Sequence, residues 1–281
     1  HAELTSSIQY ALRIQRAILP PAKYIHEHLP EHFILYKPRD IVSGDFYWFY
    51  KGTRKLYFAA ADCTGHGVPG AIMSMMGTAL LNEIANTVPG EINAAAILNL
   101  LRDNLIKSLH QVSSFYADSK SGMSEVKDGM DIAICIIDKE NHKLQFAGAN
   151  NPLYIVCKDE IKCSGNYTKK ESDSVCLYDI KPDKMPVGLH VTDRSFFTNI
   201  EIDIPENTCI YMMSDGYQDQ FGGNKNAETG KKFKATRLKY LLISINEKTM
   251  AEQHSVLSDE FEKWKGKLPQ VDDVLVIGFK V

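Results

Sequence analysis

The segment that most constrains the fold joins an apolar run to a glycine-rich turn and then to a helix. Residues 56–61 (Leu-Tyr-Phe-Ala-Ala-Ala) have the character of a buried strand, and the run ends at Asp62. A turn with one histidine follows, and Pro69 suits the first turn of a helix, where a missing backbone N–H costs little. Because a carboxylate at the mouth of a buried strand is costly without a positive partner, we expect a cation or a basic group beside Asp62.

Two functions compete for this turn. Gly65, Gly67 and Gly70 match the G-x-G-x-x-G pattern of dinucleotide-binding loops, in which a pyrophosphate lies against a helix N-terminus. Two features speak against that function: Asp62 would repel the pyrophosphate, and a second helix, residues 94–109, is predicted where a βαβ unit needs a strand. The alternative is a metal site with Asp62 as a ligand, and it predicts further carboxylates at the ends of other strands.

Such carboxylates are present. Asp45 precedes an aromatic run typical of a strand, Asp215 follows an apolar run, and Asp272 and Asp273 precede another. Each of these alone is equally consistent with a turn or a loop cap. Taken together around the glycine-rich turn, they favour a site with oxygen ligands, which suits Mg²⁺ or Mn²⁺ better than zinc.

These segments carry a family resemblance. Their order and spacing resemble the SpoIIE/RsbU-type branch of the PP2C (PPM) serine/threonine phosphatases, from about residue 33 to the end of the chain. The resemblance implies an α+β fold, a PP2C-like sandwich of two mainly antiparallel β-sheets flanked by helices. The motifs that carry it are Gly-Asp-Phe-Tyr at 44–47, Ala-Asp-Cys-Thr-Gly-His-Gly at 61–67, Ser-Asp-Gly at 214–216 and Asp-Asp-Val at 272–274, with residues 146–153 and 185–188 also similar.

The resemblance also implies a binuclear Mn²⁺ or Mg²⁺ centre that activates a water for attack on phosphorus. Asp62 matches the family's bridging aspartate, and the neighbouring backbone carbonyl ligand falls on Cys63. The other metal ligands implied by the resemblance are Asp45, Asp215 and Asp272, and additional candidates, each with an equally good structural interpretation, are Asp131, Asp219 and Asp273.

Two basic residues are candidates for roles beside the metals. His66 is a candidate general acid for the departing serine oxygen, since a donor with a pKa near neutrality suits an alkoxide; the other interpretation is a turn histidine bonded to a carbonyl. Arg39 is a candidate for binding the phosphate, with a solvated loop arginine as its alternative.

The resemblance predicts a protein serine/threonine phosphatase of bacterial partner-switching signalling, with a phosphorylated STAS-domain anti-anti-sigma protein as its substrate. The alternative is a catalytically inactive PP2C-like interaction module, which the presence of all four metal aspartates disfavours. The net charge of −3 and the pI near 6.3 give no electrostatic case for binding nucleic acid or a membrane surface. Six cysteines without a C-x-x-C pair favour a reducing cytoplasm.

The N-terminal segment is predicted to be a separate linker helix. Residues 4–19 repeat apolar side chains with a helical period, and Pro20 and Pro21 end the helix. We expect residues 1–20 to form a linker from an upstream sensor region and residues 21–281 to form the phosphatase domain. The helix is a candidate homodimer contact, and packing on its own domain is the alternative.

The remaining elements follow from apolar periodicity. Directly consecutive strands with helices in pairs favour α+β over a doubly wound sheet. Residues 113–128 and 222–232 are predicted loops, and the polar residues 158–184 are a candidate flap for substrate selection. The predicted helices are 71–86, 94–109, 237–245 and 251–264, and the predicted later strands are 132–137, 144–147, 154–157, 195–200 and 209–213.

Overall fold

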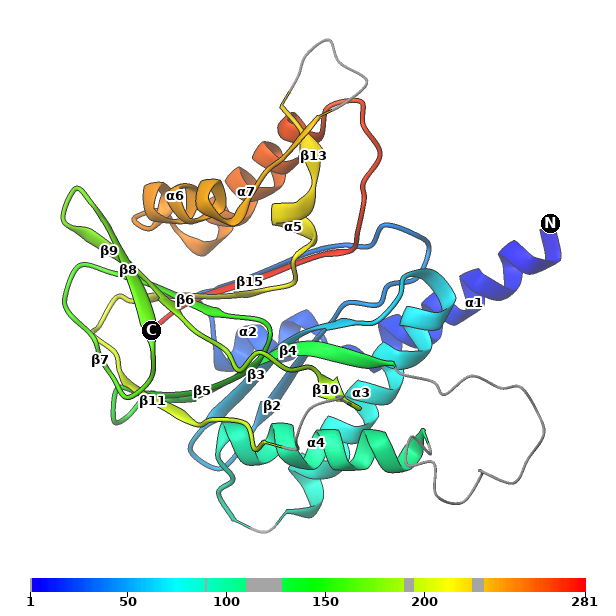
Figure 1. Ribbon diagram of the computed structural model, residues 1–281, viewed down its shortest axis with the longest axis horizontal. Coiled ribbons are helices and arrows are strands. Elements are labelled where there is room, and N and C mark those ends of the chain that lie inside the picture. Colours follow the sequence, from blue (N-terminus) through cyan, green and yellow to red (C-terminus); the bar gives the residue numbers. More distant parts are fainter. Residues whose placement is uncertain (1, 89, 110–127, 190–194, 224–229) are drawn as a thin grey trace.

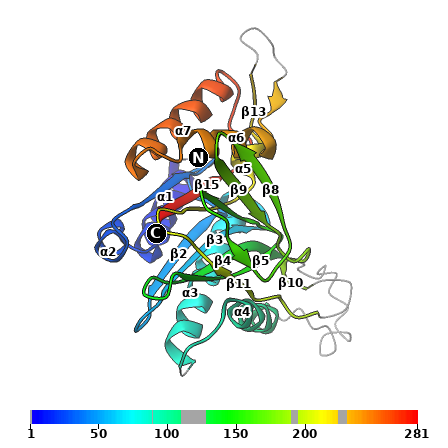
Figure 2. The ribbon, with the colours of Figure 1, turned by 90° about the vertical axis from the view of Figure 1, so that its left-hand side faces the viewer.

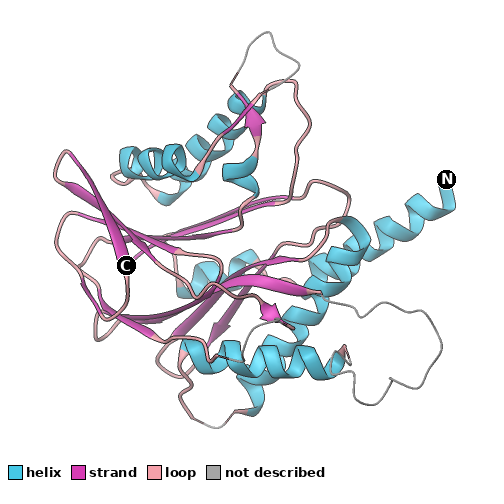
Figure 3. Ribbon diagram, in the orientation of Figure 1, coloured by secondary structure: helices cyan, strands magenta, loops and turns pink. Residues whose placement is uncertain are grey.

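Two β-sheets lie face to face in the computed structural model, with helices on both outer faces (Figures 1 and 2). The structure describes residues 2–88, 90–109, 128–189, 195–223 and 230–281. Every pairing between named strands is antiparallel, which confirms the predicted α+β sandwich. Figure 3 shows the strands inside and the helices outside.

The first sheet holds, in spatial order, β1 (His32–Lys37), β15 (Val274–Lys280), β12 (Cys209–Met213), β6 (Leu153–Cys157), β9 (Val175–Ile180) and β8 (Tyr167–Ser172). The second sheet holds β2 (Phe46–Lys51), β3 (Leu56–Cys63), β4 (Gly129–Asp138), β5 (Lys143–Ala149), β11 (Ile200–Asp203) and β7 (Lys162–Cys163), and β10 (Val187–Gly188) pairs with β4. A small hairpin is formed by β13 (Phe221–Gly222) and β14 (Lys231–Lys232).

The helices divide between the two outer faces. Those on the second sheet are α3 (Gly67–Thr87) and α4 (Ala94–Ser108), and those on the first sheet are α6 (Ala235–Ile245) and α7 (Met250–Lys265). The remaining helices are α1 (Ala2–Ile18), α2 (Ala22–His28) and the short α5 (Gly216–Asp219). The side chain of Asn93 caps α4, and a capping box of Thr249 and Glu252 begins α7.

Both faces of β3 are covered, which explains its unbroken apolar sequence. Phe58 and Ala60 point into the core between the sheets, whereas Tyr57, Ala59 and Ala61 point toward the helices. Buried strands of this kind lack the polar alternation of a half-exposed strand. Because β3 pairs antiparallel with both β2 and β4, and α4 follows α3 directly, the chain has no parallel βαβ unit here, and the dinucleotide-binding interpretation is excluded.

The structure differs from one predicted strand and adds strands to the candidate flap, whose role in substrate selection stays a prediction. The strand predicted at 195–200 lies at β11 instead, because Phe197 and Thr198 direct their backbone N–H groups to the side chains of Asn99 and Asp183 rather than to a neighbouring strand. The polar candidate flap, residues 158–184, contains β8 and β9, and all six residues of β9 are buried within the first sheet.

Other predictions lie partly outside the described residues. Of the predicted loop 113–128, only residue 128 is described, and the loop predicted at 222–232 is described only at its ends, where β13 pairs with β14. Helix α2 and strand β1 were not predicted. No helix within the described ranges is long and apolar enough to cross a membrane.

Helix α1 joins the body of the molecule through its C-terminal half. Gln15 and Leu19 are buried, whereas Tyr10 and Ile14 are exposed. The helix contacts α3, and Figure 1 shows its N-terminal half projecting from the body. Whether residues 1–20 act as a separate unit stays a prediction.

Candidate metal centre

Asp62 lies in β3, directly opposite Asp131 of β4. Two like charges at directly opposite positions of a sheet repel each other. Burial, together with Asp215, Asp272 and Asp131, raises the pKa of Asp62 to about 8. Its carboxyl group accepts no hydrogen bond from any residue that the structure describes. The end of the strand therefore carries an acid whose charge no described residue compensates by a salt bridge.

The turn after β3 packs tightly against the backbone that precedes Asp45. Gly65 and Gly67 have φ values of 86° and 64°, a region that favours glycine. A Cβ atom on Gly70 would stand 2.4 Å from the carbonyl oxygen of Gly65 and 2.9 Å from the Cα of Gly44. Glycine is therefore required where the first turn of α3 crosses this backbone, and the crossing brings Asp45 toward Asp62.

Asp45 is buried beneath the centre, with 1% of its surface exposed. The hydroxyl of Ser214 donates a 2.5 Å hydrogen bond to its Oδ2, and its own N–H donates to Ser43 Oγ. Burial is the largest cause that raises its pKa well above the ordinary value, and Asp62 is the next. The structure thus places Asp45 beside the other acids, and Ser214 orients its carboxylate.

Asp215 lies at the N-terminus of α5. The first residue of this helix, Gly216, contacts the backbone of Asp273, just before β15. A Cβ atom on Gly216 would lie 1.8 Å from the carbonyl oxygen of Asp273, so only glycine permits this approach. Burial is the main cause that raises the pKa of Asp215 to about 6, with Asp219 as the next. Asp219 itself forms a half-exposed ion pair with Lys232 at 2.7 Å and does not line the acidic cavity.

The two acids before β15 have different surroundings. Asp273 is buried, and its two carboxylate oxygens accept backbone N–H groups from Arg39 and Gly44, each at 2.7 Å. Asp272 lines the cavity; burial raises its pKa, while Arg39 and His66 act in the opposite direction. The structure therefore gives Asp273 a positioning role and leaves Asp272 as the acid that faces the centre.

A cavity of about 320 Å³ opens over these acids and is lined by Asp62, Cys63, Thr64, Gly65, His66, Asp131 and Asp272. Asp131 is held by the side-chain amide of Asn150 at 2.8 Å, and burial raises its pKa. Within the described part of the chain, no three His, Cys, Asp or Glu side chains already form a metal cage. A bound ion would have to draw the acids inward.

The donor set nevertheless fits hard divalent cations. Asp45, Asp62, Asp215 and Asp272 come from different segments, face one another, and form no salt bridge with any described residue. Carboxylates gathered in this way are costly unless cations neutralise them. Oxygen-rich sites of this kind suit Mg²⁺ or Mn²⁺.

His66 lies at the cavity rim, where it precedes α3. Its Nδ1 is 3.1 Å from Oδ2 of Asp40, and both side chains are about half exposed. The structure thus gives His66 a carboxylate partner rather than the carbonyl of the alternative interpretation. The guanidinium of Arg39 donates to the carbonyl of Val271 at 3.0 Å, which keeps it near Asp272.

Cys63 is the only cysteine that lines this cavity, and it does not suit a nucleophile. Its side chain is buried, and that burial is the largest cause that raises the pKa of the thiol well above its ordinary value. Nucleophilic cysteines need the opposite shift, because the thiolate is the reactive form. The chemistry of the site therefore rests on its acids.

Sequence reasoning missed three supporting residues. Ser214 orients Asp45, Asn150 holds Asp131, and Asp40 pairs with His66. Two of them lie in segments that resemble the family, Ser214 in 214–216 and Asn150 in 146–153, and that position is the usable signal; in the structure Asn150 adopts a φ of 58°, which is uncommon outside glycine.

The chain is similar to known proteins in sequence and in structure. The family model described as stage II sporulation protein E (SpoIIE) matches residues 52–281. Among solved structures, the SiaA-PP2C domain of Pseudomonas aeruginosa is 28% identical, with a TM-score of 0.80, and the match covers 100% of this chain and 98% of that one. No curated protein matches the chain.

Two further solved structures share the fold at lower identity. The PP2C phosphatase domain of SpoIIE from Bacillus subtilis, with a fragment of its regulatory domain, is 18% identical with a TM-score of 0.60, over 89% of this chain and 63% of that one. The RsbU and RsbW domains of a Mycobacterium tuberculosis protein are 16% identical with a TM-score of 0.58, over 90% of this chain and 60% of that one.

Proposed function

Because the chain belongs to the SpoIIE family, we propose that it is a metal-dependent protein serine/threonine phosphatase. The observation that carries the proposal is the cluster of Asp45, Asp62, Asp215 and Asp272, which come from different segments and form no salt bridge with any described residue. Such a cluster is unfavourable for folding alone, and divalent cations would compensate it.

Two Mn²⁺ or Mg²⁺ ions would be held by these four aspartates and by the backbone carbonyl of Cys63. When bound, such ions supply an activated water for attack on phosphorus and neutralise charge on the phosphoryl oxygens. Asp131 faces the same cavity and remains a candidate additional ligand. Asp273 and Asp219 are weaker candidates, since backbone amides and Lys232 occupy their oxygens.

His66 would protonate the serine or threonine oxygen as it leaves. It lines the cavity, and the Asp40 carboxylate orients its ring through Nδ1, which leaves Nε2 free to face a substrate. Arg39 is our candidate for contact with the phosphate, supported by its electrostatic effect on Asp272. Neither residue has to form a covalent intermediate.

The substrate we propose is a phosphoserine or phosphothreonine of a small protein, of the STAS-domain class, in a partner-switching pathway. This part of the proposal rests on the family resemblance. The open cavity is compatible with a residue presented on a protein surface, because its acidic floor is reached from outside past exposed Thr64 and His66.

Helix α1 would transmit a signal to this site, and a homodimer through its exposed face is part of the same hypothesis. The side-chain amide of Gln15 donates to the carbonyl of Ser43 at 2.6 Å and to Ser74 Oγ at 2.9 Å, and its oxygen accepts the N–H of Ser43. Ser43 lies two residues before Asp45. A change in the packing of α1 would therefore act directly on a proposed metal ligand.

Hydrolysis of a phosphoserine peptide and of p-nitrophenyl phosphate, with Mn²⁺ and then with excess EDTA, tests the proposal. We expect turnover only with the metal, and a loss of most activity in Asp62→Asn, while a surface control, Asp203→Asn, stays active. Full activity in EDTA would contradict the metal mechanism. No turnover of either substrate with any divalent metal would favour the inactive interaction module.

A further inference from the structure

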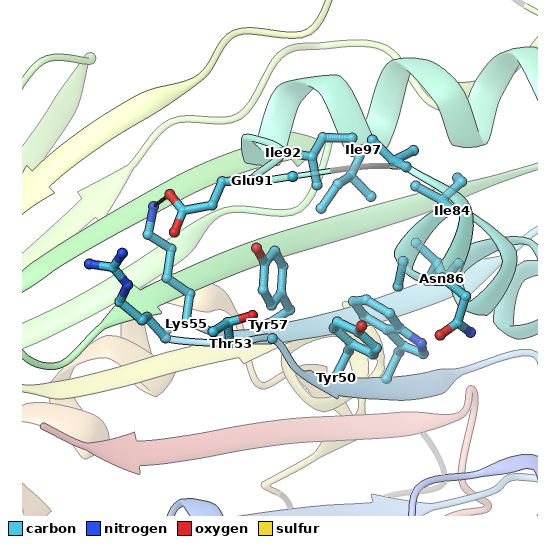
Figure 4. A pocket seen from close by; sticks show the side chains of 16 residues that line it. Tyr50, Thr53, Lys55, Tyr57, Ile84, Asn86, Glu91, Ile92 and Ile97 are labelled. Carbon is cyan, nitrogen blue, oxygen red and sulfur yellow. Dashed lines mark hydrogen bonds and ion pairs between the residues drawn. The ribbon is translucent and has the colours of Figure 1, made fainter.

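A second cavity lies at the other end of β3, between the second sheet and the helices α3 and α4 (Figure 4). Its volume is about 480 Å³, and it shares no lining residue with the acidic cavity. Tyr57, which lines it, precedes Asp62 by five residues, which corresponds to roughly 17 Å along an extended strand. The cavity is therefore separate from the proposed metal centre.

One wall of this cavity is aromatic and already in place. The rings of Trp48 and Tyr50 lie 4° from parallel with centroids 6.0 Å apart, and Tyr57 meets Tyr50 edge-on at 5.8 Å. The indole N–H of Trp48 donates to Asn82 Oδ1 at 2.8 Å, which fixes the ring. This wall is therefore preorganised for a bound molecule.

The opposite wall is aliphatic. Figure 4 shows Ile84, Ile92 and Ile97 above the aromatic side chains, with an open space between the two walls. A slot between flat rings and branched aliphatic chains fits a planar apolar group, and its volume is in the usual range for small-molecule sites.

The rim carries an uncompensated positive charge. Lys55 and Glu91 form an ion pair at 2.6 Å and cancel each other. Arg54, also in the lining, has no hydrogen bond or ion pair with any residue in the described ranges. An exposed guanidinium beside an apolar slot matches a carboxylate, to which it can donate two parallel hydrogen bonds.

Tyr57 adds a polar group inside the slot. Its side chain is 7% exposed, and its hydroxyl has no hydrogen-bond partner among the residues that the structure places. Figure 4 shows its ring in the aromatic wall, with the hydroxyl directed toward the opposite wall. An accessible hydroxyl without a protein partner, on a residue that is otherwise buried, is available to a ligand.

We propose that this cavity binds a planar aromatic monocarboxylate. The ring lies between the aromatic wall and the isoleucines, the carboxylate meets Arg54, and the Tyr57 hydroxyl contacts a polar substituent on the ring. A singly charged anion is favoured over a phosphate dianion, because Arg54 is the one uncompensated charge of the lining in the part of the chain that is described.

Calorimetric titration with 2-naphthoate tests this proposal. The protein is kept in Mg²⁺ with excess inorganic phosphate, so that an anion displaced from the proposed metal centre cannot be mistaken for the ligand. We expect saturable binding at one site per chain. Arg54→Gln should weaken it by roughly tenfold or more, the usual loss for a charge-assisted hydrogen bond. The same substitution at a remote exposed arginine, Arg13→Gln, should leave it unchanged.

Two further measurements separate this site from unspecific apolar binding. Ala85→Phe places a ring in the cavity and should abolish binding, with circular dichroism confirming that the variant is folded. The cation 2-naphthylmethylammonium should bind at least about tenfold more weakly than 2-naphthoate, because Arg54 repels it. The proposal is wrong if 2-naphthoate shows no saturable binding, if Arg54→Gln binds as well as Arg13→Gln, or if the cation binds equally.

Discussion

Replacing Asp62 with asparagine should stabilise the metal-free protein at alkaline pH, although it should remove the proposed activity. The Asp62 carboxyl is partly buried opposite Asp131, and no described residue donates a hydrogen bond to it. Asparagine has nearly the same shape and carries no charge. The variant therefore loses the repulsion among the acids without losing a hydrogen bond.

The magnitude follows from the pKa of Asp62, which rises from an ordinary 3.8 to about 8 in the folded protein. A folded-state pKa above the unfolded one means that the folded protein binds the proton more tightly. The resulting stabilisation is fully present below about pH 4 and is lost as the pH rises through about 8, and a change of this size is worth on the order of 5 kcal/mol. Asp215, with a pKa of about 6, acts in the same direction.

Urea unfolding in EDTA at pH 5 and pH 8.5 measures this effect. The wild-type protein should lose several kcal/mol between the two pH values, whereas Asp62→Asn should lose clearly less and be the more stable protein at pH 8.5 by roughly 2–5 kcal/mol. The exposed control Asp203→Asn should follow the wild type. Added Mn²⁺ should restore the wild type at pH 8.5, by about 2.7 kcal/mol at a hundred times its Kd, and should do little for Asp62→Asn.

Two results would refute this reasoning. If metal-free Asp62→Asn is less stable than the wild type at pH 8.5, the Asp62 carboxylate does not destabilise the folded protein by repulsion. If Mn²⁺ stabilises the variant and the wild type equally, Asp62 is not a metal ligand.

Three further predictions concern catalysis and control. His66→Ala should slow hydrolysis of a phosphoserine peptide on the order of 10²-fold and p-nitrophenyl phosphate much less, because nitrophenolate leaves without a proton; equal losses would make His66 a turn residue. The Mn²⁺ concentration for half-maximal activity should fall between pH 6 and pH 8, as protons on acids such as Asp215 stop competing with the metal, and a flat profile would contradict this. Gln15→Ala, or deletion of the residues before Pro20, should change the Mn²⁺ concentration that activity requires, whereas the control Arg13→Ala should not. The deletion should also convert the proposed dimer into a monomer, as measured by light scattering. If neither property changes, α1 is a passive tether.

The sequence could predict the positions of the acids because they stand at the ends of strongly apolar runs. The run before Asp62 is short, apolar and bounded by turn residues, which favours a strand, and the structure buries it on both faces. The Gly216 turn is also local, and its tight contact with the carbonyl of Asp273 explains why Asp-Gly follows the strand there. The local sequence was therefore enough to predict both the strand before Asp62 and the turn at Gly216.

The partners of the acids could not be predicted in the same way. Ser214 and Asp45 are 169 residues apart in the chain, and Gln15 and Ser43 are 28 apart. Neither pair can be found from a repeating sequence pattern. Each is a single polar contact between distant residues, and it depends on how whole helices and strands pack in the fold. Strand β9 was missed for another reason, since its short apolar run lies between polar segments that dominate any window around it.

The loop before β2 shows how the fold compensates for an irregular segment at the proposed centre. Residues 43–45 belong to no helix or strand, so their position depends on side chains from other parts of the chain. Gln15 fixes Ser43 from α1, Asp273 accepts the N–H of Gly44, and Ser214 donates to Asp45. Three elements that are distant in sequence therefore converge on three consecutive residues. This convergence explains why the second acid of the Asp272–Asp273 pair is a carboxylate: it holds the backbone that carries one proposed ligand, while its neighbour faces the cavity as another.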